Sequence, residues 1–429
     1  MKKKYRIILY TSIFLLCVVA SIILVVKKSN SVYEEESKPK VVKHKSMLSM
    51  NLEQTAGAGD YKTVTQSGWP TEGYKFNAEL SRCENGSTLS WDDTKKAVIV
   101  SGNLSDKCYV YFDIYQPTLA EYIKSQYTGT QGENNIYYHD SDLANGAGDN
   151  SYRYAGANPN NFVCFGSDTS PCPTDNLYRI IGVFGENYHG VTGKQLVKLI
   201  KYDYMTTDEL GTDGDYSQTY KEWGMDSTYK GTYGDGERIG VYYWNYKATN
   251  SATNTWSTSL LNKTNLNTNF INNIGTTWAN KIATVTWKVG GNTWANIGAK
   301  TSSVAYTNEI TNPVTTNTTD NATTYSAKIG LMYVSDYGFA ASPDAWTLTM
   351  SSYNNTTATN NNWMYMGLYE WTISRDAVNS DDAFFVSFDG DVFSSSVDGS
   401  YGVRASFNLE SSVSYVSGSG SMSDPIVIN

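Results

Sequence analysis

The sequence is poor in histidine, and this scarcity limits the catalytic chemistry that it can support. Its 429 residues include only three histidines, His44, His139 and His189. A serine or cysteine nucleophile needs a neighbouring base, but none of these histidines lies near a recognisable nucleophile motif. The chain also lacks the G-x-S-x-G, H-E-x-x-H and P-loop patterns, and no G-x-G-x-x-G occurs between a strand and a helix. We therefore predict a protein that is not an enzyme.

Clusters of basic residues are also missing from most of the chain, because none occurs after Lys45. All 42 acidic residues, but only 27 of the 33 basic ones, follow residue 28, which leaves that part with a net charge near −15. An acidic surface of this kind repels polyanions. Nucleic acid is therefore not an expected partner.

A long hydrophobic run occurs once. Residues 7–26 carry no charge, and as a helix these twenty residues would span about 30 Å, the thickness of a bilayer core. Three lysines and Arg6 precede the run, and the more basic flank of a membrane helix stays in the cytoplasm. We predict a cytoplasmic tail at 1–6, a single-pass transmembrane anchor at 7–26, and the rest of the chain outside the cell membrane.

The competing interpretation of this run is a cleaved signal peptide, with Val18-Val19-Ala20 as the cleavage site. The apolar stretch from Ile22 to Val26 would then follow the cut, where a polar region is expected. We therefore favour the uncleaved anchor. Either form of processing exports the chain, and the polar residues 27–60 are interpreted as a flexible stalk.

Four of the five cysteines lie outside the hydrophobic run. An even number of cysteines in an oxidising compartment is typical of disulfides. Neither local pair has C-x-x-C spacing or neighbouring histidines, so a zinc site is not expected. Four cysteines permit three pairings, and proximity in the sequence favours Cys83 with Cys108 and Cys164 with Cys172.

Aromatic and β-branched residues predict a strand-rich α+β fold in two parts. Aromatic residues make up 14% of the chain, and Asn, Thr, Ser and Gly are frequent between short apolar stretches, which is typical of strands joined by turns. Residues 61–115 are predicted to form a small disulfide-tied β-domain. A capping box at Thr118 and Glu121 predicts a helix that begins the large domain, residues 116–429.

Several stretches of the large domain resemble a group of uncharacterised membrane-anchored surface proteins of Gram-positive bacteria. They are SYRYAGANPNNFVCFG (151–166), NLYRIIGVF (176–184), KIGLMYVSDYGFA (328–340), WTISR (371–375), FDGDV (388–392) and GVRASFNL (402–409). The C-terminal domains of that group look similar to the C-type-lectin-like fold that formylglycine-generating enzymes share. The resemblance implies a lectin-like domain with loop insertions and, as mainly architectural elements, Trp371, Arg375, Gly390, Gly402 and Arg404.

The chain departs from this resemblance in three ways. Ala405 stands where the group's usual tail, Gly-Val-Arg-Pro, has proline. Formylglycine-generating enzymes need a late pair of cysteines, and none follows Cys172 here. The Glu-Pro-Asn or Gln-Pro-Asp triplet of calcium-dependent sugar-binding lectins is absent as well. Neither formylglycine generation nor calcium-dependent sugar binding is therefore expected of this chain.

Acidic residues suggest two further possibilities. Asp140, Asp142, Asn145 and Asp149 lie in one loop, whose oxygen atoms could hold a structural Ca²⁺, although their spacing is not that of an EF-hand. Otherwise we expect no cofactor and no metal. A polysaccharide hydrolase would need two carboxylates across a cleft, and nothing in the sequence pairs two of its many acidic residues.

Aromatic side chains in Asn/Thr/Ser-rich stretches are the main candidates for ligand binding, because exposed rings stack on sugars or anchor protein partners. The residues selected on this ground are Tyr242, Tyr243, Trp244, Trp346, Trp363 and Tyr365. Burial of each ring between the insertions and the core is the competing interpretation. We predict a surface protein that binds a glycan or a protein; an extracellular polysaccharide hydrolase and a purely structural cell-envelope protein are the alternatives.

Overall fold

A computed structural model describes residues 48–65, 67–70, 73–103, 105–224, 228–247, 253–313, 322–354 and 359–429. The predicted tail (1–6), the anchor (7–26) and residues 27–47 of the stalk lie outside this set. Within the described ranges, no helix is both long and apolar enough to cross a bilayer. The chain divides into two compact units, an N-terminal unit that ends at Tyr115 and a C-terminal unit from Gln116 to Asn429.

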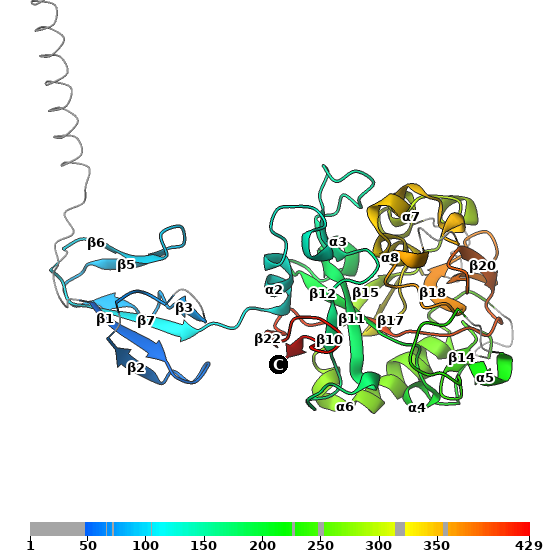
Figure 1. The fold of residues 1–429 in the computed structure, drawn as a ribbon, viewed down its shortest axis with the longest axis horizontal. Helices are drawn as coiled ribbons and strands as arrows, with labels where there is room; N and C mark the ends of the chain where they lie inside the picture. The colour runs from blue at the N-terminus through cyan, green and yellow to red at the C-terminus, as the bar shows by residue number, and fades with distance from the viewer. Residues whose placement is uncertain are drawn as a thin grey trace, which may run out of the picture. The chain divides into compact units, whose positions relative to one another are not determined.

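The N-terminal unit is made of short strands (Figure 1). Its strands are β1 (Leu48–Glu53), β2 (Tyr61–Val64), β3 (Tyr74–Phe76), β4 (Arg82–Cys83), β5 (Thr88–Asp92), β6 (Ala97–Ser101) and β7 (Cys108–Ile114). The main sheet has the order β2-β1-β7-β3, with β4 also paired to β7, and β5 and β6 form a separate hairpin. β1 runs parallel to β7, and the remaining pairs of this sheet are antiparallel.

The stalk was predicted over residues 27–60, but Leu48–Glu53 of this range form strand β1, so the predicted stalk is too long. Met50 and Leu52 of this strand are buried against Val110 and Phe112 of β7. Apolar residues at alternate positions are typical of a strand with one buried face. The signal was missed because it covers few residues and lies between polar stretches.

Aromatic rings and a disulfide hold this small unit together. Phe112 lies at the centre, with the ring centroids of Trp69, Phe76 and Trp91 at 5.9, 5.9 and 5.6 Å. The predicted Cys83–Cys108 disulfide is confirmed and joins β4 to β7. A unit of this size buries little apolar surface, so the covalent link contributes a large share of its stability.

The C-terminal unit contains sixteen strands among its described residues. They are β8 (Ile136–His139), β9 (Ser151–Tyr154), β10 (Phe162–Cys164), β11 (Leu177–Phe184), β12 (Leu196–Lys201), β13 (Tyr216–Thr219), β14 (Gly240–Tyr242), β15 (Val285–Lys288), β16 (Thr324–Ala327), β17 (Ile329–Gly330), β18 (Glu370–Arg375), β19 (Asp382–Val386), β20 (Val392–Ser396), β21 (Ser406–Asn408), β22 (Tyr415–Ser417) and β23 (Val427–Ile428).

Short helices lie between these strands. The α-helices are α2 (Leu119–Ser125), α3 (Glu186–His189), α4 (Thr207–Leu210), α5 (Tyr220–Trp223), α6 (Ile271–Ala279), α7 (Ser302–Tyr306) and α8 (Val334–Ala340). The 3₁₀ and π turns are η1 (Glu133–Asn135), η2 (Thr174–Asn176), η3 (Leu261–Phe270), η4 (Trp294–Asn296), η5 (Thr307–Thr311), η6 (Pro343–Thr347) and η7 (Met350–Ser352). The predicted capping box of Thr118 and Glu121 is present at the start of α2.

The central sheet has the order β17-β21-β12-β11-β9-β8, and β10 also pairs with β11. β11 and β12 run through the middle of the unit, with α6 and α7 on different sides of it (Figure 1). The end of the chain returns to an early strand: the Ile426 N–H donates to the Phe162 carbonyl at 2.9 Å. A separate three-stranded sheet has the order β18-β19-β20.

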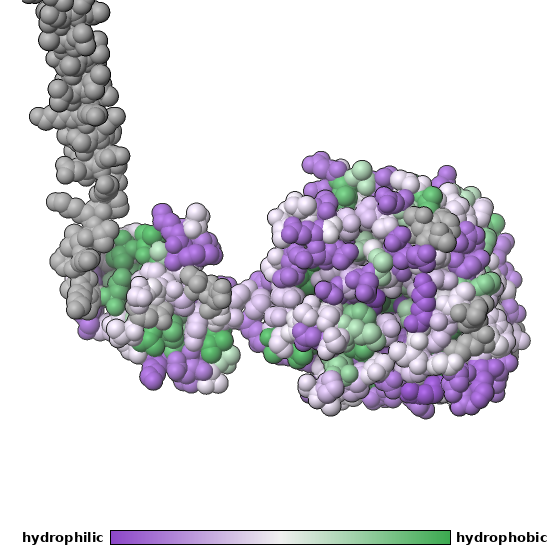
Figure 2. Space-filling view, in the orientation of Figure 1, coloured by the Kyte–Doolittle hydropathy of each residue, from purple (hydrophilic) through white to green (hydrophobic). Residues whose placement is uncertain are grey.

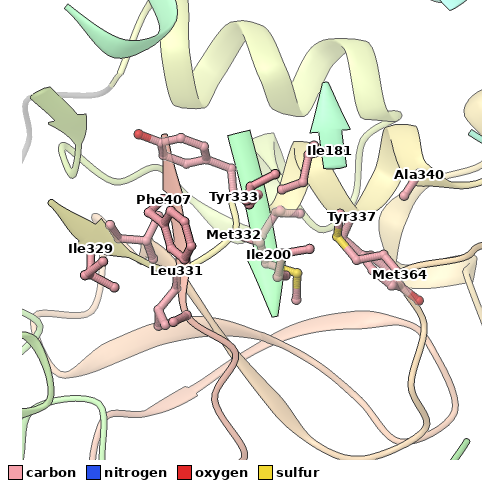
Figure 3. Close-up of a cluster of buried hydrophobic side chains, with 14 of the residues drawn as sticks. Ile181, Ile200, Ile329, Leu331, Met332, Tyr333, Tyr337, Ala340, Met364 and Phe407 are labelled. Atoms are coloured by element: carbon pink, nitrogen blue, oxygen red, sulfur yellow. The ribbon is translucent and has the colours of Figure 1, made fainter. Parts of the chain in front are cut away.

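The core of this unit is continuous across the sheet and the helices that cover it. Figure 3 shows Ile181 and Ile200 of the two central strands beside Phe407, Met332 and Tyr337. All five side chains are buried. The result is a mixed α+β, strand-rich fold with two disulfides, the second being Cys164–Cys172, also as predicted.

Three local sequence patterns predict structure that differs from this fold. The acidic, Gly-rich and Tyr-rich residues 203–246 are typical of a long loop but contain α4, β13, α5 and β14. The Thr/Asn-rich residues 284–325 are typical of β-turn insertions but include β15, η4, α7 and η5. The apolar residues 328–334 predict one strand, but strand β17 covers only Ile329–Gly330 and α8 begins at Val334.

Candidate functional site

A pocket on the C-terminal unit is lined almost entirely by aromatic and aliphatic groups. It has a volume of about 210 Å³, and we call it the aromatic pocket. Its lining residues come from three separate segments: Tyr220, Trp223, Gly224, Leu368, Tyr369 and Phe388. No charged side chain is among them.

The rings of this pocket contact one another mostly edge to face. Trp223 meets Tyr220 at a centroid distance of 5.3 Å and Tyr369 at 5.4 Å, both edge to face. Phe388 meets Tyr369 at 5.3 Å in the same manner, and Tyr401 stacks on Tyr369 at 5.2 Å. Such pairs add about 1 kcal/mol each beyond the burial of area, so the rings hold one another in place.

Trp223 is positioned by a one-turn helix with defined ends. At the start of α5, the Thr219 N–H donates to Glu222 Oε2 at 2.9 Å, which forms a capping box. At its end, the Gly224 N–H donates to the Tyr220 carbonyl at 2.8 Å, and Gly224 has a φ of +105° that suits glycine. The helix therefore stops directly after Trp223 and leaves 39% of that residue exposed.

Tyr220 forms the inner wall of the pocket. Its hydroxyl donates to the Tyr369 carbonyl at 2.6 Å, which ties α5 to the segment before β18. Burial raises the pKa of Tyr220 well above its usual value, so the hydroxyl stays neutral and keeps its proton for this bond. Gly402 allows the close approach, because a Cβ at that position would lie 3.1 Å from the Tyr220 ring.

An ion pair lies next to the pocket in the interior. The Arg404 guanidinium donates from Nε and Nη2 to the two oxygens of Glu370, at 2.8 and 2.9 Å. Its Nη2 also donates to the Met364 carbonyl at 2.7 Å. Both charged residues are about 1% exposed. Because Glu370 follows Tyr369 directly, this pair fixes the backbone from which the pocket tyrosine projects.

Two carboxyl groups follow Phe388 in the turn between β19 and β20. Burial and a hydrogen bond with Asp389 raise the pKa of Asp391 to about 7.

The ligand-binding residues selected from the sequence do not form a surface. Five of the six are buried, at 6% exposure or less: Tyr242, Trp244, Trp346, Trp363 and Tyr365. Their polar atoms are used internally; the Trp244 indole N–H, for example, donates to the Thr372 carbonyl at 2.9 Å. Tyr243 is half-buried, and its ring lies 4.9 Å from that of the exposed Tyr246. The competing interpretation, burial against the core, is correct for the five.

The five residues assigned an architectural role are all buried and make internal contacts. The Trp371 indole donates to the Tyr242 carbonyl at 2.9 Å, and Arg375 Nε donates to the Val289 carbonyl at 3.0 Å. Gly390 has a φ of +103°, and a Cβ there would lie 2.9 Å from the Tyr353 carbonyl oxygen. Gly402 and Arg404 contribute as described above.

The acidic loop proposed for calcium uses its oxygens within the protein. Asp140 Oδ1 accepts the N–H groups of Asp142 and Leu143, each at 3.0 Å. Asp149 pairs with Arg153 at 2.8 Å. In the part of the chain that the structure describes, no three His, Cys, Asp or Glu side chains form a group that could hold a metal ion.

The sequence did not predict Trp223, Tyr369 and Phe388 as site residues. A local signal existed for Trp223 alone: the Thr219–Glu222 capping box is followed two residues later by Gly224, a pattern that predicts a one-turn helix ending at Trp223. Tyr369 and Phe388 carry no such signal. They become a site only when β18 and the β19–β20 turn are placed beside α5.

No family model, curated protein or solved structure matches the chain.

Proposed function

We propose that the chain is a membrane-anchored surface protein whose C-terminal unit binds a neutral glycan through the aromatic pocket. The observation that carries the proposal is a solvent-facing group of rings, Trp223, Tyr369 and Phe388, around a cavity of about 210 Å³. The faces of aromatic rings attract the C–H groups of sugars, and exposed tryptophan and tyrosine dominate many recognition sites.

The pocket favours a neutral ligand. No charged group lines it, and the exported part of the chain is strongly acidic. A polyanionic glycan would therefore be repelled at long range and would find no cation in the pocket. The same lining suits a neutral sugar, whose apolar face can be buried without leaving an unpaired charge.

A carbohydrate fits the pocket better than a folded protein partner does. The view in Figure 2 shows a mainly hydrophilic surface with scattered small hydrophobic areas. A stable protein interface usually buries about 800 Å² per partner around a hydrophobic centre. A small ring-lined pocket is matched instead to one or two sugar residues.

The proposed location and fold rest on the sequence. The hydrophobic run 7–26 with its basic flank supports an anchor that leaves both units outside the membrane. The two disulfides support an oxidising compartment. A C-type-lectin-like relationship for residues 116–429 is proposed from the sequence stretches given above, and it would place ligand binding in the loop-rich part of the domain.

The experiment is a glycan array probed with the purified full-length protein in detergent. We expect the wild-type protein to bind neutral glycans and the Trp223→Ala variant to lose the signal on the same glycans. Trp294→Ala is the control, because Trp294 is 40% exposed but lies in η4, outside the pocket. An array without signal, or equal signals from the two variants, would contradict the proposal.

A further inference from the structure

Lys198 of β12 and Asp336 of α8 meet in the interior of the C-terminal unit. The Lys198 Nζ lies 2.6 Å from Asp336 Oδ2, and both side chains are fully buried. The Tyr188 hydroxyl bridges them: it lies 2.6 Å from the Lys198 Nζ and 2.6 Å from Asp336 Oδ1. The amine and the carboxyl group are therefore held in contact, out of reach of bulk water.

Aromatic rings enclose the amine. The Lys198 Nζ lies 4.4 Å from the ring centroid of Tyr333, 4.8 Å from that of Tyr188 and 5.0 Å from that of Trp287. Burial in this environment lowers the pKa of Lys198, although Asp336 opposes the shift. A lowered pKa increases the fraction of neutral amine, which is the nucleophilic form.

A second buried carboxyl group lies close by. Glu309 accepts the N–H groups of Val334 and Ser335 at 3.0 and 2.9 Å, at the start of the helix that carries Asp336. Burial raises the pKa of Glu309, and its charge acts on Lys198 through space. The two hydrogen bonds to Glu309 hold the start of α8, and with it Asp336, in place.

A cation faces the oxygen of Asp336 that does not contact Lys198. Arg153 Nη1 lies 3.7 Å from Asp336 Oδ1 and has no hydrogen-bond partner within the described residues. Attack on the carboxyl carbon would build negative charge on that oxygen. The guanidinium and the Tyr188 hydroxyl would stabilise this charge, as the donors of an oxyanion hole do.

We propose that Lys198 and Asp336 become joined by an intramolecular amide bond. The Lys198 Nζ attacks Cγ of Asp336, a C–N bond forms and one C–O bond breaks. Two protons of the ammonium group leave with the departing oxygen as one water molecule, so an ammonium and a carboxylate give one amide and one water. The Tyr188 hydroxyl, which contacts both groups, passes a proton from the nitrogen to that oxygen, and no oxidant, metal or cofactor is required.

The bond would cross-link β12 and α8 at the centre of the C-terminal unit. β12 is an inner strand of the main sheet, and 138 residues separate Lys198 from Asp336. A cross-link at this point would prevent α8 and β12 from separating even when the unit unfolds. Such a link suits a protein exposed outside the cell to proteases and mechanical load.

A second buried lysine on the same strand provides a matched comparison. Lys201 also contacts a carboxylate, Glu209 Oε1, at 2.5 Å. The Glu209 side chain is 12% exposed, and its other oxygen accepts the Thr206 N–H and hydroxyl in a capping box. The Lys201 Nζ lies 5.7 Å from the Tyr178 ring centroid, farther than Lys198 lies from each of its three rings, so we expect this pair to remain ionic.

The experiment is the intact mass of the full-length protein after reduction and alkylation of its cysteines. We expect a mass lower by one water molecule than the sequence requires. A tryptic digest should lack the cut after Lys198 and contain a branched peptide that includes Asp336. An unmodified mass together with an ordinary peptide ending at Lys198 would overturn the proposal and leave a buried ion pair.

Two variants separate the chemistry from simple packing. Tyr188→Phe should yield protein of unmodified mass, because the hydroxyl that passes the proton is lost while the ring is kept. Lys201→Arg should retain the loss of one water, with the branch still at Lys198. If Tyr188→Phe retains the cross-link, the role given to Tyr188 is wrong. If either variant fails to fold, the wild-type mass and digest still decide whether the bond exists.

Discussion

Arg404 binds Glu370 through two hydrogen bonds in the interior of the C-terminal unit, one residue from Tyr369 of the aromatic pocket. Both side chains are at most 2% exposed. Two charges can be buried at this depth only because each satisfies the other. Arg404 does not line the pocket, but through Glu370 it holds the backbone next to Tyr369.

Removing one partner of this pair should destabilise the unit strongly. We expect Arg404→Met to leave Glu370 buried and unpaired, and to lower the free energy of unfolding by about 3–5 kcal/mol. Urea unfolding followed by near-UV circular dichroism measures the change. The control is Arg238→Met, because the Arg238–Asp175 pair is about 45% exposed and should change stability by less than about 1 kcal/mol. Equal effects of the two substitutions would show that burial does not set the strength of these pairs.

The two disulfides should differ in their effect. The loop closed by Cys83 and Cys108 spans 25 residues, and that closed by Cys164 and Cys172 spans 8. On the chain-entropy model, replacing both cysteines of a pair by serine costs about 3.5 kcal/mol for the first and about 2.5 kcal/mol for the second. We expect the first pair of substitutions to unfold the N-terminal unit at 37 °C, because its core is small. Native-like proteolysis patterns of both double variants would contradict this expectation.

Asp391 should make the stability of the C-terminal unit depend on pH. Its pKa rises from 3.8 to about 7 in the folded state, so the folded protein binds this proton more tightly than the unfolded chain does. The resulting stabilisation is complete below about pH 4 and is lost as the pH rises through 7. Asp391→Asn cannot ionise, so we expect it to be more stable than the wild type at pH 8 by about 2 kcal/mol, with a smaller difference at pH 4.5.

Urea unfolding at the two pH values tests this assignment. Asp398→Asn is the matched control, because Asp398 is exposed in the same part of the chain and should alter stability little at either pH. If the wild type and Asp391→Asn show parallel pH profiles, the pKa of Asp391 is not raised in the folded protein.

The N-terminal segment is tested separately. We expect full-length protein to fractionate with membranes and to retain its first residues, and we expect a protease added to intact cells to remove both folded units. Intact mass before and after the digestion measures the result. A mature N-terminus after Ala20 would show a cleaved signal peptide instead, and protection of both units would contradict export.

Local patterns predicted local structure well. The capping box of Thr118 and Glu121 and the two nearest-neighbour disulfides depend on residues close in the sequence, and all are present. The largely apolar stretches Leu177–Phe184 and Leu196–Lys201 are typical of buried central strands, and they form β11 and β12. Strand β1 was missed because it covers few residues between polar stretches, and its partner β7 lies about sixty residues away.

Exposure of individual aromatic rings could not be predicted in the same way. Trp244 and Trp223 both lie in stretches rich in tyrosine and glycine, but Trp244 is fully buried and Trp223 is not. The difference comes from Thr372, 128 residues away, whose carbonyl accepts the Trp244 indole N–H. Composition around a ring does not contain this information, so it could not show that five of the six selected rings are buried.

The affinity of the strongest array glycan for wild type, Trp223→Ala and Trp294→Ala, measured by calorimetry on the full-length protein, tests the central claim most directly. Loss of an exposed ring at the centre of a binding site typically costs at least 1.4 kcal/mol, or roughly tenfold in Kd. We predict a weakening of roughly tenfold or more for Trp223→Ala and a Kd within about twofold of the wild type for Trp294→Ala. Equal Kd values for all three proteins would contradict glycan binding through the aromatic pocket.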